Sequence, residues 1–360
     1  RSKMTSVLLN EIYQSDIRNV TNLDIDWNRL YGKTLLITGA TGMIASALID
    51  ILMCKNQNIQ GRDGIHIIAV SRNEEKARER FATYWNSEFF SYLSHDITMP
   101  LPELGNVSYI LHAASNTHPR AYAMDPIGTI TANVEGTHQL LEYAAGHMCE
   151  RFFFFSSVEI YGENRKDTEQ FDENYLGYID CNTVRAGYPE SKRLGETLCN
   201  AYATQKGQDF VIGRFSRAYG PTMQERDSKA IAQFIKKAVA GEDIVLKSEG
   251  TQVYSYTYVV DAAAAILYLL LYAKSGDAIN IADRKSDISL REIARILAEI
   301  AHTNVIFEQP DELERKGYST ATRATLNPER MENMGWVAKT DIREGLKKTV
   351  ECLKNWQSFS

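Results

Sequence analysis

Apolar runs of strand length alternate with helical patterns over the first 216 residues of the chain. The run TLLIT (34–38) is continuously apolar, as expected for a strand covered on both faces, and MIASALIDILM (43–53) has helical spacing. The alternation continues with apolar runs at 65–71, 107–115, 151–162 and 209–216 and helical patterns at 73–85, 134–147 and 188–205. Strands alternating with helices form βαβ units, so the pattern predicts a doubly wound α/β fold around a parallel sheet.

The pattern changes after residue 216, where the elements become shorter. Helical patterns at 231–241, 290–302 and 343–356 accompany the strand-like DIVLK (243–247). They predict a smaller second domain beyond the strand ends, where folds of this class bind their ligands. The apolar stretch 262–273 is shorter than the ~18 residues of a membrane span and favours a buried helix. The expected organisation is a helical extension (1–30), a first domain (31–216, with 255–282 returning to it) and a second domain (217–360).

The composition is that of an ordinary globular protein and restricts the choice of partners. The 360 residues carry a net charge of -6, which gives no general attraction for nucleic acid or an anionic membrane. The five cysteines are scattered and include no Cys-x-x-Cys pair, and no cluster of His, Cys and carboxylate residues indicates a metal. Such cysteines favour reduced thiols, so we expect a cytoplasmic protein.

A glycine-rich turn joins the first strand to the first helix. The segment TGATGMIA places Gly39 and Gly42 in this turn, followed by the small residue Ala45. Glycines permit a tight turn and let backbone N–H groups and the helix N-terminus approach a pyrophosphate. Two glycines can also form a plain turn, but a strand before them and a helix after them favour a dinucleotide site. The other cofactor contacts expected here are Thr41, Met43 and Ile44.

The end of the second strand indicates which dinucleotide is bound. An acidic residue there would hold the ribose 2′-OH of NAD, whereas this strand ends in Ser71 and Arg72. A guanidinium suits a 2′-phosphate because it can form charge-assisted bidentate contacts. Arg72 can also be a solvated residue at the start of a helix. We expect NADP as the cofactor, with NAD as the alternative.

The segment AGYPESKRLGE (186–196) contains a tyrosine and a lysine four positions apart. Proline is favoured at the first helical position, so Pro189 is expected to start a helix with Tyr188 at its mouth and Lys192 one turn along. A nearby ammonium and the helix dipole both favour the phenolate, which predicts a lowered Tyr188 pKa and a general base. The spacing also arises by chance, but its place after the fifth strand of a nucleotide-binding fold favours a catalytic pair.

Six motifs together resemble those of a known family. TGATGMIA, HAAS, SSVEIYG, YPESK, RAYGP and a late GW follow the order found in extended short-chain dehydrogenases/reductases, which include nucleotide-sugar epimerases, dehydratases and decarboxylases. The resemblance runs from Lys33 to Trp356, and the segment 181–202 is most similar to UDP-glucuronate decarboxylases. It implies a Rossmann dinucleotide-binding domain, a nucleotide-sugar substrate and a homodimer.

The resemblance also implies roles for individual residues. Ser157 matches the serine or threonine that hydrogen-bonds the sugar O4, and Glu159 matches a glutamate that moves a proton at C5 or holds the sugar. A solvated loop glutamate is the alternative for Glu159. Dehydratases carry an Asp before this Glu, and because Val158 has no proton to give, dehydration is disfavoured. Further cofactor contacts implied by the family pattern are Asp96, Ile97, Ala113, Ala114 and Ser115.

Two positions depart from the family pattern. Arg217 stands where relatives carry an Asn that contacts the substrate, and Tyr254 stands where relatives carry an arginine for the nucleotide diphosphate. Arg323 matches an arginine that contacts phosphate or a sugar carboxylate in relatives. We therefore expect all three to bind substrate, with Arg217 and Arg323 sharing recognition of the diphosphate. Ordinary ion pairs are the alternative for both arginines.

These residues predict an enzyme that oxidises a nucleotide sugar at C4 by hydride transfer to NAD(P) and later returns the hydride. If C6 is a carboxylate, the β-keto acid loses CO2, and this decarboxylase reaction is our first hypothesis. A ketone that rotates before reduction would make the enzyme a 4-epimerase, and free NADPH would make it a one-way 4-ketoreductase. A non-catalytic NADP-binding module would have no need of Ser157, Tyr188 and Lys192 together.

Overall fold

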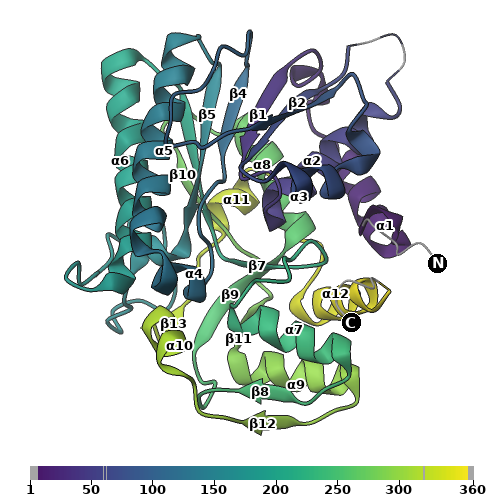
Figure 1. The fold of residues 1–360 in the computed structure, drawn as a ribbon. Helices are drawn as coiled ribbons and strands as arrows, with labels where there is room; N and C mark the ends of the chain where they lie inside the picture. The colour runs from purple at the N-terminus through teal and green to yellow at the C-terminus, as the bar shows by residue number, and fades with distance from the viewer. Residues whose placement is uncertain (1–6, 60, 62, 319–320, 356–360) are drawn as a thin grey trace.

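A seven-stranded parallel sheet forms the centre of the protein (Figure 1). The computed structural model describes residues 7–59, 61, 63–318 and 321–355. The strand order is β10-β6-β5-β4-β1-β2-β3, and each neighbouring pair is parallel. The strands are β1 (Thr34–Thr38), β2 (His66–Ser71), β3 (Phe90–Ser94), β4 (Tyr109–His112), β5 (Arg151–Ser157), β6 (Phe210–Phe215) and β10 (Ala278–Ile281). The predicted doubly wound α/β fold is confirmed, with the strand order reversing between β1 and β4.

Helices cover both faces of the sheet (Figure 1). The first face carries α2 (Met43–Asn56) and α8 (Val259–Tyr272), and the second carries α5 (Pro126–Gly146) and α6 (Gly187–Lys206). The four consecutive phenylalanines of β5 serve both faces: Phe153 packs in the core of the first face, and Phe152 and Phe154 pack in that of the second. Side chains alternate along a strand, so a continuously apolar strand fills two cores.

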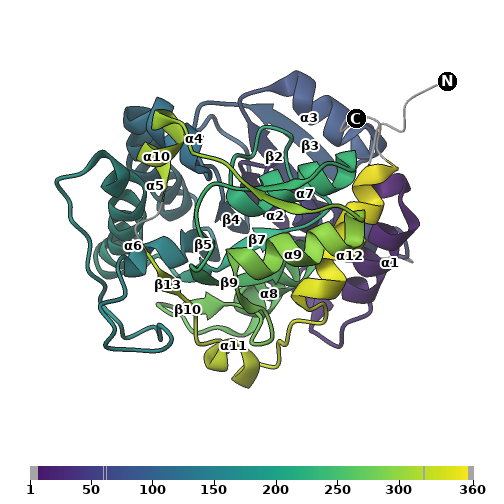
Figure 2. The same ribbon diagram turned by 90° about the horizontal axis from the view of Figure 1, so that it is seen from below.

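Most of the chain after β6 forms a smaller unit at the carboxyl ends of the parallel strands (Figures 1 and 2). One sheet has the order β11-β9-β13 with β7 also paired to β9, and a second consists of β12 and β8. The strands are β7 (Arg217–Tyr219), β8 (Ile244–Leu246), β9 (Val253–Tyr258), β11 (Asp287–Ser289), β12 (Val305–Phe307) and β13 (Arg323–Ala324). The helices of this unit are α7 (Ala230–Ala240), α9 (Leu290–Ala301), α10 (Glu312–Gly317) and α12 (Ile342–Lys354), whereas α11 (Glu329–Asn333) packs beside β10 of the large sheet.

Several helices begin or end at positions set by local side chains. α5 begins at Pro126 rather than at 134, because the Asp125 side chain accepts a hydrogen bond from the backbone N–H of Gly128 and caps the helix. The pattern at 73–85 forms only α3 (Glu74–Arg80) and a short 3₁₀ turn. The remaining short elements are α1 (Glu11–Thr21), α4 (Pro119–Met124), η1 (Val7–Leu9), η2 (Trp27–Arg29), η3 (Ala82–Tyr84), η4 (Val158–Tyr161) and η5 (Val184–Ala186).

Helix α8 is buried, as its apolar sequence predicts. Nearly every residue from Val259 to Leu271 is shielded from solvent between the two units. No helix within the described part of the chain combines the length and apolar character needed to cross a bilayer.

The N-terminal helix α1 is fastened to both units. The Tyr13 hydroxyl donates to the carboxylate of Asp50 on α2 at 2.6 Å. One turn further along α1, Asp16 accepts from the hydroxyl of Tyr258 on β9 (2.7 Å) and from the ammonium of Lys348 on α12 (2.8 Å). Because its partners come from the large sheet's helical layer and from the smaller unit, α1 links the two.

Asp50 is the centre of a buried cluster beneath α1. Its side chain has no exposed area and accepts hydrogen bonds from Tyr13, from the Tyr84 hydroxyl (3.0 Å) and from Arg80, whose Nη1 lies at 3.1 Å. A buried carboxylate needs a cation and several donors to balance the water that it loses. Arg80 supplies that cation.

We predict that Arg80→Ala lowers the free energy of unfolding by about 3 kcal/mol, because it leaves Asp50 buried without its cation. The control is Arg78→Ala on the same helix, where both Arg78 and its partner Glu74 are more than half exposed. This change should cost less than about 1 kcal/mol. Urea unfolding followed by circular dichroism measures both values, and equal losses would contradict the role given to the buried pair.

Candidate functional site

A long cavity runs along the carboxyl ends of the parallel strands, between the large sheet and the smaller unit. Its walls come from the glycine turn after β1, the ends of β2, β4 and β5, the start of α6 and strands β7 and β9. All strands of the large sheet point the same way, so residues that follow different strands meet at this edge. Every predicted site residue lines the cavity except Arg323.

The glycine turn packs directly against the loop that follows β4. Gly39 has a φ of +59°, and a Cβ on it would stand 2.7 Å from the backbone N and Cα of Ala114. The Thr38 hydroxyl accepts hydrogen bonds from the N–H groups of Ala113 and Ala114, both at 3.1 Å, and so holds the two segments together. Only glycine combines this backbone conformation with such a close approach.

The N-terminus of α2 opens toward the cavity. Gly42 is the N-cap residue and provides no side-chain cap, so the first N–H groups of the helix are left for a ligand. An uncapped helix N-terminus beside a tight glycine turn suits a pyrophosphate. From the smaller unit, the Thr222 hydroxyl donates to the Met43 carbonyl (2.8 Å) and the Gln224 amide donates to the Thr41 carbonyl (3.0 Å). The site therefore fits a dinucleotide, closed in by the second unit.

Residues after β2 and β3 form the end of the cavity expected to hold the adenosine ribose. The Ser71 hydroxyl is within 2.9 Å of the Tyr92 hydroxyl, and Arg72 follows with an exposed side chain that borders the cavity. Hydrogen bonds from the backbone and hydroxyl of Thr98 hold the pKa of Asp96 below its usual value, and the charge of Arg72 acts in the same direction. The Arg72 guanidinium has the exposure needed to meet a phosphate.

Helix α6 places Tyr188 and Lys192 on one buried face. The helix begins at Gly187, so Pro189 is its third residue rather than its first as predicted. The ring nitrogen of proline causes no loss there, because N–H groups of the first turn have no partner within the helix. The Lys192 ammonium lies 5.8 Å from the centroid of the Tyr188 ring and donates to the Phe155 carbonyl at 2.6 Å.

Burial is the largest influence on the pKa values of Tyr188 and Lys192. It lowers the pKa of Lys192 to about 7, with the carboxylate of Glu196 acting in the opposite direction. It raises the pKa of Tyr188 to about 12, although a hydrogen bond with Ser157 lowers it in part. The predicted lowering of the Tyr188 pKa is therefore wrong, since desolvation of the phenolate outweighs its favourable partners.

Two arginines and a glutamate, here called the Arg185–Glu159–Arg217 cluster, lie beside Tyr188. Arg185 Nη2 donates to Glu159 Oε2 at 2.9 Å, and Arg217 Nη2 lies 3.7 Å from Glu159 Oε1. The Arg217 guanidinium also stacks on the ring of Tyr254, 3.5 Å from its centroid. The Glu159 side chain is only 18% exposed, so it is not a solvated loop residue. The cluster carries two positive charges and one negative charge.

Sequence reasoning missed two residues of this site, Tyr122 and Arg185. The Tyr122 ring stacks on that of Tyr188 with centroids 4.6 Å apart, and the Arg185 guanidinium lies 4.8 Å from the centroid of Tyr122. The Arg185 Nη1 atom is buried and has no hydrogen-bond partner among the described residues. Arg185 lies within the segment 181–202, whose similarity to UDP-glucuronate decarboxylases was a signal for it. No pattern singled out Tyr122, which lies on the short helix α4 between a predicted strand and a predicted helix.

Arg323 lies outside the cavity. Its side chain is exposed, and its Nε donates to the backbone carbonyl of Glu169 at 3.1 Å. The expectation that Arg217 and Arg323 act together on a diphosphate is therefore wrong for Arg323. A sequence match fixed the position of Arg323 along the chain but not the direction of its side chain.

We predict that Gly39→Ala abolishes dinucleotide binding, because its Cβ would collide with the backbone of Ala114. Gly207→Ala is the matched control, since Gly207 has a similar φ of +71° but no atom within 4 Å of a Cβ. Isothermal titration with NAD and NADP, together with the melting temperature, measures both variants. The control should lose some stability but keep its affinity, and equal loss of affinity in both variants would contradict the close-approach explanation.

Comparison with known proteins agrees with this geometry. Residues 35–282 match the family described as "NAD dependent epimerase/dehydratase family". UDP-glucuronic acid decarboxylase 5 of Arabidopsis thaliana is 30% identical over 317 residues, which cover 87% of this chain and 86% of that protein. UDP-glucuronic acid decarboxylase 1 of Xenopus tropicalis is 28% identical over 323 residues, which cover 88% of this chain and 71% of that protein.

Solved structures share the fold. The UDP-glucuronic acid 4-epimerase of Bacillus cereus, in complex with UDP-glucuronic acid and NAD, superposes with a TM-score of 0.74 at 20% identity, covering 89% of this chain and 99% of that chain. The dTDP-glucose 4,6-dehydratase of Streptomyces venezuelae gives a TM-score of 0.77 at 22% identity, covering 91% of this chain and 100% of that chain. With the family match spanning more than half of its length and the same architecture in solved relatives, this chain belongs to the NAD-dependent epimerase/dehydratase family.

Proposed function

We propose that this protein is an NAD(P)-dependent enzyme that modifies a nucleotide sugar by transient oxidation at C4, with UDP-glucuronate as substrate and decarboxylation as the reaction. Similar proteins named UDP-glucuronic acid decarboxylase support the substrate class. The observation that carries the choice of an acidic sugar is the Arg185–Glu159–Arg217 cluster beside Tyr188, and the names of these similar proteins support decarboxylation.

The charge of this cluster favours an acidic sugar over a neutral one. Two guanidinium groups face one carboxylate, which leaves one positive charge on a poorly solvated wall of the cavity. A carboxylate at C6 would balance this charge, because charge-assisted hydrogen bonds from guanidinium groups to carboxylates are strong. A 4-epimerase acting on a neutral hexose would leave it unbalanced.

The chain's own residues would divide the reaction among them. Tyr188 takes the proton of the C4 hydroxyl, Ser157 hydrogen-bonds O4, and Lys192 supplies a positive charge beside the phenol. The bound nicotinamide supplies a hydride acceptor and, in its oxidised form, a further positive charge. A ketone at C4 withdraws the electron pair of the C5–C6 bond, so the carboxylate leaves as CO2. Glu159 orients Arg185 and Arg217 around it.

We propose NADP as the dinucleotide, with NAD as the alternative. Gly39, Gly42 and the N-terminus of α2 would hold the pyrophosphate, and Ser71 and Arg72 would surround the 2′ position. An exposed guanidinium at that position supports NADP because it can pair with a 2′-phosphate.

We also propose a homodimer, as the family resemblance implies. Ile127 and Ile130 on α5 and Leu194 on the adjoining α6 expose apolar side chains. A surface of this kind on two neighbouring helices suits contact with a second copy of the chain.

We predict that the purified protein, given UDP-, GDP-, CDP- and dTDP-sugars, converts UDP-glucuronate to a product lighter by CO2, and that denaturation releases NADP. Mass spectrometry identifies both. Tyr188→Phe should lower turnover at least about 100-fold, because it removes the group that accepts the hydroxyl proton.

Other outcomes of the same panel identify the rival reactions. An isobaric product would replace the proposal with a 4-epimerase, and a gain of two hydrogens would replace it with a 4-ketoreductase. Full turnover by Tyr188→Phe would contradict the catalytic assignment for any of the three.

We predict that Arg217→Ala raises the KM for UDP-glucuronate about tenfold and leaves dinucleotide affinity unchanged, because it removes one charged donor from the sugar end. Arg323→Ala is the control, since its side chain points away from the cavity. Steady-state kinetics measures the KM of each variant. An increase with Arg323→Ala as large as that with Arg217→Ala would contradict the assignment.

A further inference from the structure

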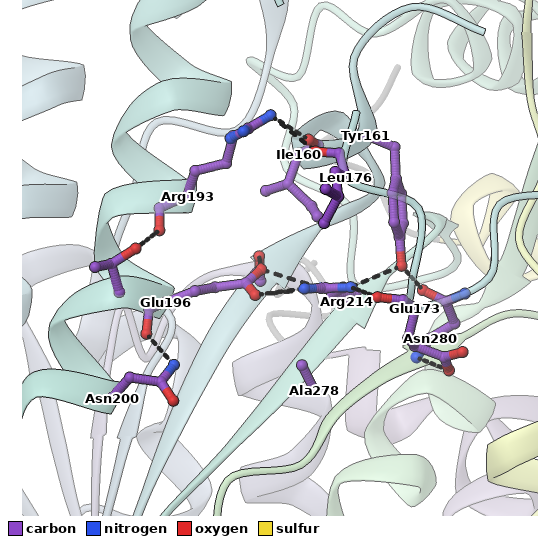
Figure 3. Close-up of polar contacts among 12 residues, drawn as sticks. Ile160, Tyr161, Glu173, Leu176, Arg193, Glu196, Asn200, Arg214, Ala278 and Asn280 are labelled. Carbon is purple, nitrogen blue, oxygen red and sulfur yellow. Dashed lines mark hydrogen bonds and ion pairs between the residues drawn. The ribbon is translucent and has the colours of Figure 1, made fainter. Parts of the chain in front are cut away.

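Behind the catalytic pair lies a second buried ion pair, between Glu196 of α6 and Arg214 of β6. Figure 3 shows the Arg214 guanidinium between the Glu196 carboxylate and Tyr161. Arg214 Nη2 donates to Glu196 Oε1 at 2.7 Å, and Nε lies 3.2 Å from Oε2. Both side chains are close to nine-tenths buried. The Ser156 hydroxyl donates to the same carboxylate at 2.6 Å, so Glu196 is held from two sides.

The Nη1 atom of Arg214, which faces away from Glu196, is also held by hydrogen bonds. It donates to the Tyr161 hydroxyl at 3.0 Å and to the Glu173 carbonyl at 3.1 Å. Tyr161 in turn donates to Asn280 Oδ1 on β10 at 2.6 Å (Figure 3). A guanidinium with this many fixed partners cannot rotate away, so the position of the Glu196 carboxylate is determined by a network that spans α6, β6 and β10.

Glu196 stands one helical turn after Lys192 on the same face of α6. Lys192 lines the cavity, whereas Glu196 and Arg214 do not. Glu196 therefore acts on the cavity only indirectly, through its neighbours Lys192 and Ser156, which both line it. Both side chains are buried, and a charge interaction between them is poorly screened.

Within the described part of the chain, the other groups around Lys192 supply no negative charge. On α6 the neighbour is the neutral phenol of Tyr188, and from β5 come the Phe154 ring at 5.1 Å and the Phe155 carbonyl. From β4 comes His112, which is neutral because burial lowers its pKa to about 3. Among the described groups, Glu196 is thus the one whose charge opposes the effect of burial on the Lys192 pKa.

We propose that Glu196 is a positioning residue that keeps Lys192 cationic, and that Arg214 and Ser156 hold its carboxylate in place for that purpose. A buried ammonium without a nearby anion loses its proton to solvent. A buried carboxylate needs charged or hydrogen-bonding partners to balance the water that it loses, and Arg214 and Ser156 are those partners of Glu196. Arg214 also limits the effect of Glu196, because its positive charge cancels part of the field at Lys192.

The direct test is the titration of Lys192, followed by the ¹³Cε resonance of labelled lysine and assigned through its loss in Lys192→Met. The wild-type midpoint should lie near pH 7. Glu196→Gln keeps the shape of the side chain but removes its charge, and it should lower the midpoint by about one pH unit. Glu190→Gln removes a more exposed charge from the same helix and should leave the midpoint unchanged.

Two variants of Arg214 separate charge from packing. Arg214→Lys keeps the positive charge but loses the planar guanidinium that forms two hydrogen bonds with Glu196. The titration midpoint of Lys192 should therefore stay near that of the wild type. A shift equal to that of Glu196→Gln would mean that loosened packing is responsible and would overturn the proposal. Arg214→Gln removes the compensating charge and should raise the midpoint. If Glu196→Gln does not fold, Arg214→Gln becomes the test. An unchanged or lowered Lys192 midpoint in Arg214→Gln would then overturn the proposal.

The expected effect on turnover rests on the function proposed above, whereas the titration does not. At pH 7 the charged fraction of Lys192 should fall in Glu196→Gln from about one half to about one tenth, so kcat should fall about fivefold. The KM for the nucleotide sugar should not change, because Glu196 does not line the cavity. A shifted midpoint with unchanged kcat would support the coupling and contradict the catalytic role of Lys192. An unchanged midpoint would overturn the coupling itself.

Discussion

The parallel sheet imposes the constraint on which the rest of this protein depends. Its strands all end at one edge, and both of its faces are covered by helices, so polar side chains needed for chemistry have one place to gather. The glycine turn follows β1. Ser157 ends β5 and Glu159 lies just after it, and Arg217 lies two residues after the end of β6. The smaller unit then covers this edge. A buried site results, and burial in turn decides the charges of the groups inside it.

Buried charges are handled in the same way at three places. Asp50 with Arg80, Glu159 with Arg185, and Glu196 with Arg214 each pair a carboxylate with a guanidinium rather than with an ammonium. A guanidinium offers several donors in a fixed plane and keeps its proton when desolvated. Lys192 differs from these guanidinium groups, because its buried ammonium is held by a carbonyl and its pKa falls. A charge that burial can tune in this way suits the catalytic role proposed for Lys192.

The features that the sequence predicted well are those fixed by local chemistry. Continuous apolar runs predicted buried parallel strands, and the glycines of the β1–α2 turn and the spacing of Tyr188 and Lys192 predicted residues that line one cavity in the folded chain. What the sequence could not supply depends on contacts between distant segments. Arg185 meets Glu159 only in the folded chain, Tyr122 reaches Tyr188 from a different helix, and Arg323 turns outward. The direction of the Tyr188 pKa was misjudged for the same reason, because the degree of burial is a property of the whole fold.

Helix α1 joins the two units at one end of the molecule. Its bonds to α2, β9 and α12 cross between the two units, and they lie at the opposite end of the molecule from α4 and α10 (Figures 1 and 2). Separating the two units at this end would have to break either the Tyr13 contact or both contacts of Asp16, because α1 could stay with only one of the units. The first helix of the chain therefore resists opening of the interface at the end where it lies.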